Sequence, residues 1–242
     1  MDTYTSEAGT LNTNVKYRHE YKYVINAAQK AILISRLPSV MSSDPYAGIE
    51  GVYRIRSLYF DDFYNSCYED NLNGEDIREK FRIRLYNGST DFMRLEVKRK
   101  EHGKTLKKSC PVTPEIVNSL VQGDDLEWDP CMHPLLKKLY VQQKLSGMQP
   151  KVIVEYDRMP FVCSDGNVRV TLDMNISAST EIERFMDHTV LTRPVMPIGK
   201  DLLEVKYDEF LPDYISRTVQ VNRLQYTAFS KYFLCRKFGG VR

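Results

Sequence analysis

Apolar and polar positions alternate along most of the chain, which is the pattern of β-strands. We count seven or eight strands, and the clearest segments are rich in β-branched and aromatic residues. These segments are 20–25, 52–62, 78–86, 92–100, 151–161, 168–176 and 201–209. Turn residues such as Asn87-Gly88 join neighbouring segments into hairpin-like pairs, so the pattern predicts a mostly antiparallel sheet.

Helical periodicity and capping residues predict about four helices. Their predicted starts are Asn26, Thr113, His133 and Pro212, and their predicted ends are Pro38, Gly123, Gly147 and Gly239. Strand pairs combined with separate helices indicate the α+β class. We find no internal repeat or linker, and predict a single domain over residues 16–242 after a disordered polar leader over residues 1–15.

Composition places the chain among ordinary globular proteins, with 42% hydrophobic and 27% charged residues in 242. No apolar run approaches the ~18–20 residues that span a bilayer, and no secretory signal is visible. The five cysteines are odd in number and widely spaced, which argues against disulfides and a cysteine zinc site. These features predict a cytoplasmic protein with reduced thiols.

The net charge of +2 conceals a strongly basic segment. From Arg78 to Lys108 the sequence has eleven Lys or Arg against four Asp or Glu, so this segment carries +7 and the rest −5. Such a concentration favours an anionic partner. Nucleic acid is the weaker candidate, because no aromatic residues interleave with the cluster from Lys98 to Lys108 at stacking positions.

Charged residues occupy every second position of the predicted strands, so each strand has one charged and one apolar face. The charged rows are Glu20 and Lys22; Arg54 and Arg56; Arg78, Lys80, Arg82 and Arg84; Glu96, Lys98 and Lys100; Arg169, Thr171 and Asp173; and Glu204 with Lys206. Two architectures fit: a half-exposed sheet, or a closed barrel with a charged lumen and helices outside. The lumen of such a barrel would bind polyanions strongly.

The strings RHEYKYVI, RIRSLYFDD, REKFRIRLYNG, RLEVKRK and LLEVKY, in this order, resemble bacterial members of the VTC (vacuolar transporter chaperone) domain family. The resemblance spans roughly Arg18 to Phe238. That family belongs to the triphosphate tunnel metalloenzyme, or CYTH-like, superfamily. The resemblance therefore implies an α+β fold whose centre is an eight-stranded antiparallel β-barrel tunnel with flanking helices, which binds triphosphates and a divalent metal.

The resemblance also implies an activity, that of a polyphosphate polymerase transferring the γ-phosphate of ATP onto a polyphosphate or pyrophosphate acceptor. The residues assigned to catalysis are Arg82, Arg84, Lys98, Arg169 and Lys231. Those assigned to phosphate binding, partly from the charged rows, are Lys22, Arg54, Arg56, Lys80, Tyr156, Arg158 and Lys206. Glu204 in LLEVK matches a metal-binding glutamate, so Mn²⁺ or Mg²⁺ is the expected cofactor. Glu20 and Glu96 fit either metal ligands or internal salt-bridge partners, and we favour the second.

Two rival functions stay open on sequence alone: a tripolyphosphatase or nucleoside triphosphatase of the same fold, and a polyphosphate-binding module without activity. A plugged tunnel would favour hydrolysis, and one open at both ends a long product. The motif G-x-x-x-x-G-K-[ST] is not present, which excludes a P-loop nucleotide site. Any association with a membrane would depend on binding to a separate membrane protein.

Overall fold

The computed structural model describes residues 17–240, and the leader predicted over residues 1–15 lies outside them. Its strands are β1 (His19–Asn26), β2 (Ser42–Ser43), β3 (Tyr53–Asp61), β4 (Arg78–Tyr86), β5 (Ser89–Glu101), β6 (Lys104–Pro111), β7 (Gln149–Cys163), β8 (Val168–Ser179), β9 (Arg193–Pro194) and β10 (Lys200–Tyr207). Its α-helices are α1 (Ala27–Arg36), α2 (Ser66–Leu72), α3 (Pro114–Val121), α4 (Pro134–Ser146), α5 (Asp213–Val219) and α6 (Lys231–Phe238).

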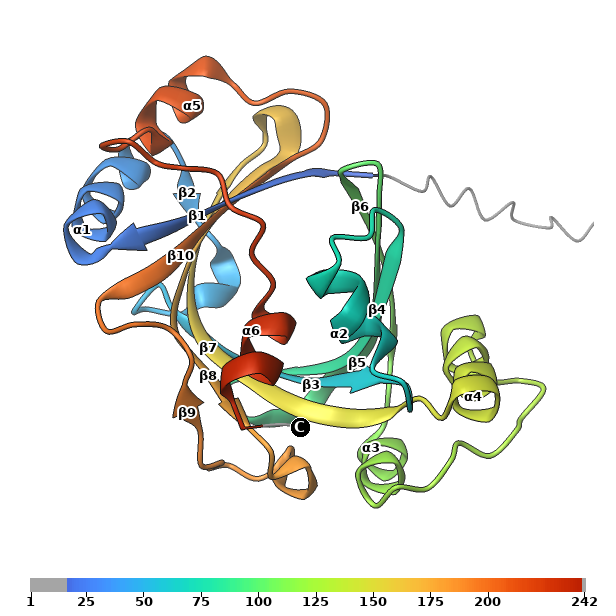
Figure 1. The fold of residues 1–242 in the computed structure, drawn as a ribbon. Helices are drawn as coiled ribbons and strands as arrows, with labels where there is room; N and C mark the ends of the chain where they lie inside the picture. The colour runs from blue at the N-terminus through green and yellow to red at the C-terminus, as the bar shows by residue number, and fades with distance from the viewer. Residues whose placement is uncertain (1–16, 241–242) are drawn as a thin grey trace, which may run out of the picture.

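A single antiparallel sheet forms the centre of the molecule and curls strongly on itself (Figure 1). Its main strand order is β1-β10-β8-β7-β3-β4-β5-β6, with β2 and β9 attached to β7 and β8. The two ends of this order meet at an isolated bridge, where Arg18 and Thr105 exchange backbone hydrogen bonds of 3.1 and 3.2 Å. The predicted α+β class and the predicted eight-stranded antiparallel sheet are therefore confirmed.

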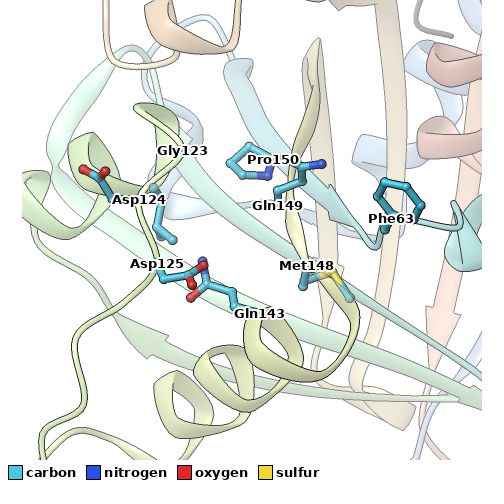
Figure 2. A pocket seen from close by; sticks show the side chains of 10 residues that line it. Phe63, Gly123, Asp124, Asp125, Gln143, Met148, Gln149 and Pro150 are labelled. Carbon is cyan, nitrogen blue, oxygen red and sulfur yellow. The ribbon is translucent and has the colours of Figure 1, made fainter.

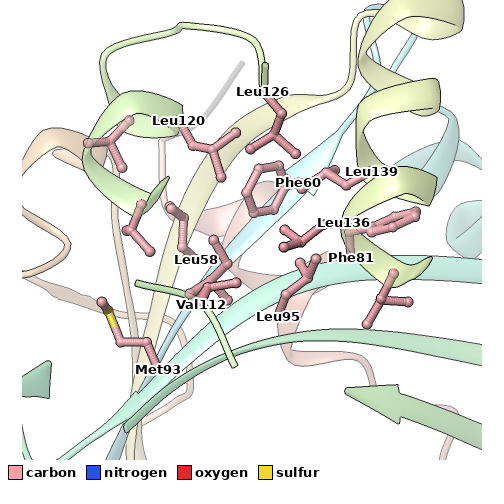
Figure 3. Close-up of a cluster of buried hydrophobic side chains, with 14 of the residues drawn as sticks. Leu58, Phe60, Phe81, Met93, Leu95, Val112, Leu120, Leu126, Leu136 and Leu139 are labelled. Carbon is pink, nitrogen blue, oxygen red and sulfur yellow. The ribbon is translucent and has the colours of Figure 1, made fainter. Parts of the chain in front are cut away.

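The convex face of β3, β4 and β5 is apolar and is covered by α3 and α4 (Figure 3). Leu58, Phe60 and Ile83 of the sheet pack there with Leu120 and Leu139 of the helices. Burial of this layer supplies the hydrophobic free energy that fixes the strand register, because a shift by one residue would turn every apolar side chain inward.

A second convex layer joins β8 and β10 to α1 and α5. The start of α1 forms as predicted: Asn26 accepts from the backbone N–H of Gln29, and the Gln29 side chain accepts from the backbone N–H of Asn26, both at 2.9 Å. This capping box satisfies two amides that the first helical turn leaves unpaired. The helices of both layers keep apolar faces outside the sheet and leave its concave face for other groups.

The concave face carries a third, smaller apolar layer, on which α6 lies (Figure 1). Tyr232 and Cys235 of α6 pack there against Val154 of β7 and Ala178 of β8. A bulge at Asn175, whose φ is 54°, reverses the alternation of β8 and turns Ala178 inward. The C-terminal helix therefore occupies one part of the concave face, and polar residues line another part.

Three parts of the predicted element list need correction. Strand β6 was not predicted, because KTLKKSCP is poor in β-branched and aromatic residues; α2 was also missed. The predicted single C-terminal helix is divided into α5 and α6. Between them the chain bonds to the free edge of β1, where the Thr227 amide donates to the Lys22 carbonyl at 2.9 Å, so its backbone groups are used outside a helix.

Candidate functional site

Strand register places the predicted basic residues opposite one another on the concave face. Arg82 pairs with Tyr59 on one side and Glu96 on the other, and Lys22 pairs with Glu204. Cross-strand partners point to the same side of a sheet, so these rows form one surface. We call it the cationic face and define it by Lys22, Lys80, Arg82, Arg84, Lys98, Lys107, Arg158, Arg169, Lys206 and Lys231.

Glu204 on β10 lies at the centre of this face and is 3% exposed. Its Oε1 accepts from Lys231 Nζ at 2.9 Å, and its Oε2 accepts from Lys206 Nζ at 2.8 Å and Arg158 Nη2 at 3.3 Å. Lys22 Nζ lies 3.8 Å from Oε1. Four basic residues from four different elements thus converge on one buried carboxylate.

Asp173 on β8 extends this cluster and is fully buried. Arg158 donates to both of its oxygens, from Nε at 2.6 Å and from Nη2 at 2.7 Å, and Lys231 Nζ lies 2.5 Å from Oδ2. Bidentate pairing fixes the plane of the guanidinium as well as its position. The cationic groups of Arg158 and Lys231 also both lie over the ring of Tyr156, at 5.3 and 4.7 Å from its centroid.

A second cluster forms around Glu96 on β5, which is 2% exposed. Its Oε2 accepts from Arg82 Nε at 2.7 Å, and its Oε1 accepts from Lys107 Nζ at 3.0 Å. Arg84 Nη1 lies 3.9 Å from Oε2. Lys107 belongs to the unpredicted strand β6, so the sequence pattern gave no reason to assign it to the site.

Glu20 links the two ends of the curled sheet. Its Oε2 accepts from Lys98 Nζ of β5 at 2.7 Å, and its Oε1 lies 3.1 Å from Lys22 Nζ and 4.0 Å from Lys206 Nζ. Glu20 and Glu96 both therefore act as ion-pair partners of basic side chains in this structure, which is the role favoured from the sequence.

Arg169 and Lys80 lie at the margins of the cationic face. Arg169 Nη2 donates to Asp44 at 2.6 Å and to the Tyr53 hydroxyl at 2.8 Å. Lys80 Nζ donates to Asn71 Oδ1 at 2.7 Å and to Ser230 Oγ at 3.0 Å, which are both neutral oxygens.

Arg54 and Arg56 depart from the prediction, because the structure places them on the convex face. Arg56 is 2% exposed, pairs with Glu155 at 2.7 Å and donates to the Phe185 carbonyl at 3.0 Å. Arg54 pairs with Asp157 at 3.2 Å. On β3 the concave positions are the odd ones, such as Tyr59, so an alternating charged row was assigned to the wrong side of its strand.

Ion pairing shifts the titration of the carboxylates strongly. Burial alone would raise the pKa of Glu204, but Lys206, Lys231, Lys22 and Arg158 hold it well below its usual range. Burial would also raise the pKa of Glu20, but the charges of Lys22 and Lys98 outweigh burial and lower that pKa well below its usual range. These carboxylates are therefore ionised at neutral pH and are weak bases.

The pKa values of three lysines of the cationic face, Lys80, Lys98 and Lys206, are lowered as well, which for a lysine disfavours the charged form. Burial, reinforced by Arg78, lowers the pKa of Lys80 to about 7. Burial also lowers the pKa of Lys98 to about 8, although Glu20 opposes the shift. These ammonium groups consequently lie in surroundings where an additional anion would stabilise their charged form.

A divalent metal fits this donor set only in part. Within residues 17–240 no group of three His, Cys, Asp or Glu lies together as a preformed metal site. Mg²⁺ is, however, commonly bound through one or two carboxylates plus substrate phosphates. Glu204 can supply one such carboxylate if a phosphate chain takes over Lys206 and Lys231, so the residues fit a metal that arrives with phosphate.

Hollows elsewhere on the molecule do not coincide with the cationic face. A cavity of about 180 Å³ lies between the end of α4 and the start of β7, lined by Phe63, Asp124, Asp125, Gln143 and Pro150 among others (Figure 2). A groove of about 730 Å³ beside α6 is lined mainly by apolar residues, including Val24 and Phe233. None of the residues predicted to bind phosphate or metal lines either one.

Solved structures share the curled antiparallel fold that carries the cationic face. Among solved structures, the Hippeastrum protein HpAC1, described as having a dominant triphosphatase activity, is 12% identical, with 92% of this chain and 95% of that chain covered and a TM-score of 0.53. The PH1819 protein of Pyrococcus horikoshii OT3 is 14% identical, with 91% and 99% covered and a TM-score of 0.48.

The model of the VTC domain family matches residues 17–238, so this chain belongs to the VTC domain family. The resemblance seen in the sequence is thereby confirmed. A comparison with curated proteins found no match. Within residues 17–240, no helix has the length and apolar character needed to cross a membrane.

Proposed function

We propose that this chain is a polyphosphate polymerase that transfers the γ-phosphate of ATP to the end of a polyphosphate or pyrophosphate acceptor on the cationic face. The observation that carries the proposal is the imbalance of charge there. The basic residues of that face outnumber its carboxylates Glu20, Glu96, Asp173 and Glu204, all of which are buried or nearly so. A polyanion is the ligand that offsets such an excess.

Phosphoryl transfer suits a site of this kind, because it requires positioning and charge stabilisation more than covalent chemistry. Arg82, Arg84 and Arg158 present planar forks of donors that match phosphate oxygens, and their carboxylate partners keep these forks aligned. Lys22, Lys98 and Lys206 add movable point charges at partly exposed positions. Together these groups would screen the repulsion between donor and acceptor phosphates.

The acceptor needs no general base, since a terminal phosphate is already anionic at neutral pH. The carboxylates of the cationic face fit this requirement, because low pKa values make Glu20 and Glu204 poor proton acceptors. Transfer to a phosphate oxygen is therefore better supported than activation of water by a carboxylate.

Mn²⁺ or Mg²⁺ is part of the proposal, with Glu204 as its protein ligand. Such a metal would act as a Lewis acid on bound phosphate oxygens. Release of Glu204 from Lys231 and Lys206 by the incoming phosphates would free the carboxylate for this role.

A tripolyphosphatase is the second candidate, and the position of α6 favours it. The ring centroids of Tyr232 and Tyr59 lie 5.3 Å apart, and Cys235 packs in the same concave layer. Helix α6 therefore occupies space that a long phosphate chain would need in order to pass along the concave face. The triphosphatase activity described for the Hippeastrum protein of similar fold points to the same reaction.

The two functions separate in one experiment, ³¹P NMR of the purified chain with ATP and Mn²⁺. The polymerase predicts growth of an internal-phosphate signal together with ADP. Release of orthophosphate without that signal would rule out the polymerase and support the hydrolase. Tripolyphosphate that binds but is never turned over, with or without added pyrophosphate acceptor, would leave a binding module.

A further inference from the structure

Asp61, the last residue of β3, is fully buried and accepts hydrogen bonds from the first turn of α2. Its Oδ1 accepts from the Cys67 amide at 2.8 Å and from the Asp62 amide at 2.9 Å, and its Oδ2 accepts from the Tyr68 amide at 3.1 Å. The Cys67 and Tyr68 amides belong to the first turn of α2, so the carboxylate fixes the position of that helix start.

The same carboxylate also holds α6. Tyr232 donates its hydroxyl proton to Asp61 Oδ2, and Arg236 Nη1 lies 3.4 Å from that oxygen. Arg236 also donates to the Tyr232 hydroxyl at 2.8 Å and, from Nη2, to Asn65 Oδ1 at 2.8 Å. One buried carboxylate therefore ties the C-terminal helix to β3 and to the start of α2.

Both helices hold lysines of the cationic face. Lys231 directly precedes Tyr232 and reaches Glu204 and Asp173 from the first turn of α6. Lys80 is held between Asn71 of α2 and Ser230, the residue that caps α6. The position of each ammonium group thus depends on where these helices lie.

Such short helices do not hold their own position. The seven residues of α2 and the eight of α6 are far below the length at which an isolated helix is stable, so tertiary contacts decide where they lie. A group that acts on a reacting phosphate must be placed to within about 0.5 Å. A loosened helix would leave the lysine in the chain but misplace its charge.

We propose that Asp61 is a positioning residue for phosphoryl transfer, which fixes α2 and α6 and thereby places Lys80 and Lys231 on the cationic face. This inference rests on the proposed function. The role falls to Asp61, the first aspartate of the Asp61-Asp62 pair. The hydrogen bonds and ion pair of Asp61 given above join it to α2 and α6, and it acts on the phosphate-binding residues through these helices.

A double-mutant cycle tests the proposal, with the full chain, ATP and Mn²⁺ for turnover and tripolyphosphate for binding. Asp61→Asn should lower kcat/KM about 10- to 100-fold, as loss of an outer-shell partner commonly does. In a chain that already carries Lys231→Ala, the same change should cost at least about threefold less than in the wild type, because only its effect through Lys80 remains. Coupled residues are non-additive in such cycles, whereas independent ones multiply.

Lys98→Ala supplies the matched control, because Lys98 is held by Glu20 of β1 and not by α2 or α6. Its effect should multiply with that of Asp61→Asn. Tyr232→Phe is the second variant, since it removes the hydroxyl link to α6 and leaves Asp61 capping α2. It should be non-additive with Lys231→Ala even if Asp61→Asn fails to fold.

Two negative results have different meanings. If the wild-type chain is active and the effects of Tyr232→Phe and Lys231→Ala are fully additive, the positioning role alone is overturned. A wild-type chain that neither binds tripolyphosphate nor turns it over would overturn the proposed function, and this inference with it.

Discussion

Lys231 at the start of α6 donates to Glu204 of β10 across 2.9 Å, so a residue of the C-terminal helix completes a site built on the sheet. Glu204 is at the same time bonded to Lys206 and Arg158. The chain's own carboxylates thus balance part of the positive charge of this face, and a phosphate chain must compete with Glu204 for Lys231, Lys206 and Arg158.

Glu204→Gln tests the role of that carboxylate. We expect metal-dependent turnover to be lost and tripolyphosphate binding to be kept, because Gln removes a competitor for Lys206 and Lys231. Removing one partner of a buried ion pair should also cost about 3 kcal/mol of unfolding free energy. Urea unfolding with and without tripolyphosphate measures both effects, and turnover that survives in the variant would disprove the metal assignment.

Binding of tripolyphosphate should weaken as the pH rises above about 7. The pKa of Lys80 is lowered to about 7 and that of Lys98 to about 8, so each amine is partly neutral above those values. A bound polyanion favours the ammonium form, and binding therefore takes up protons in the window from about pH 7 to the ordinary lysine value near 10.4.

Isothermal titration calorimetry with tripolyphosphate, in buffers of different ionisation enthalpy, measures this proton uptake. Lys80→Met is the control, because the ligand's own titration is common to both proteins and the difference between them isolates Lys80. In the same pH window Lys80 and Lys98 hold more protons in the unfolded chain than in the folded one, so their own contribution to stability rises with pH. Equal uptake by the variant and the wild type would contradict the role of Lys80.

Arg158→Lys should be damaging even though it keeps the charge. Arg158 binds Asp173 through two nitrogens, and the compact ammonium of lysine cannot reproduce that fork. We expect a loss of about 2 kcal/mol in unfolding free energy, since Asp173 would keep a buried oxygen with a weaker partner. Thermal unfolding checks this, with Arg54→Lys on the convex surface as a control that should change little. A stability loss equal in the two variants would be the contrary result.

Much of the fold could be predicted from sequence because strand alternation is strong where the strands are rich in apolar and aromatic residues. The segment Arg78–Tyr86 was predicted with the boundaries that the structure shows. Strand β6 could not be, since Lys104–Pro111 has a polar composition and becomes a strand only by pairing with β5. Lys107 was missed from the site for the same reason.

Alternation shows that residues share a face but not which face is concave. Arg54 and Arg56 were assigned to the site on that pattern, whereas register places Tyr59 and its odd-numbered neighbours inward. Asp173 lies in a charged row that the pattern identified, but its pairing with Arg158 depends on the neighbouring strand. Contacts between distant elements, such as those of α6 with Asp61, have no local signal in the sequence.

The most direct test of the central claim compares two arginines on opposite faces of adjacent strands. Arg84 lies on the cationic face and Arg54 on the convex surface. We predict that Arg84→Ala lowers ATP-dependent phosphoryl transfer about 100-fold or more and flattens the salt dependence of tripolyphosphate binding, while Arg54→Ala changes either by less than about twofold. Equal losses in the two variants, or a fully active Arg84→Ala, would show that the concave face is not the active site.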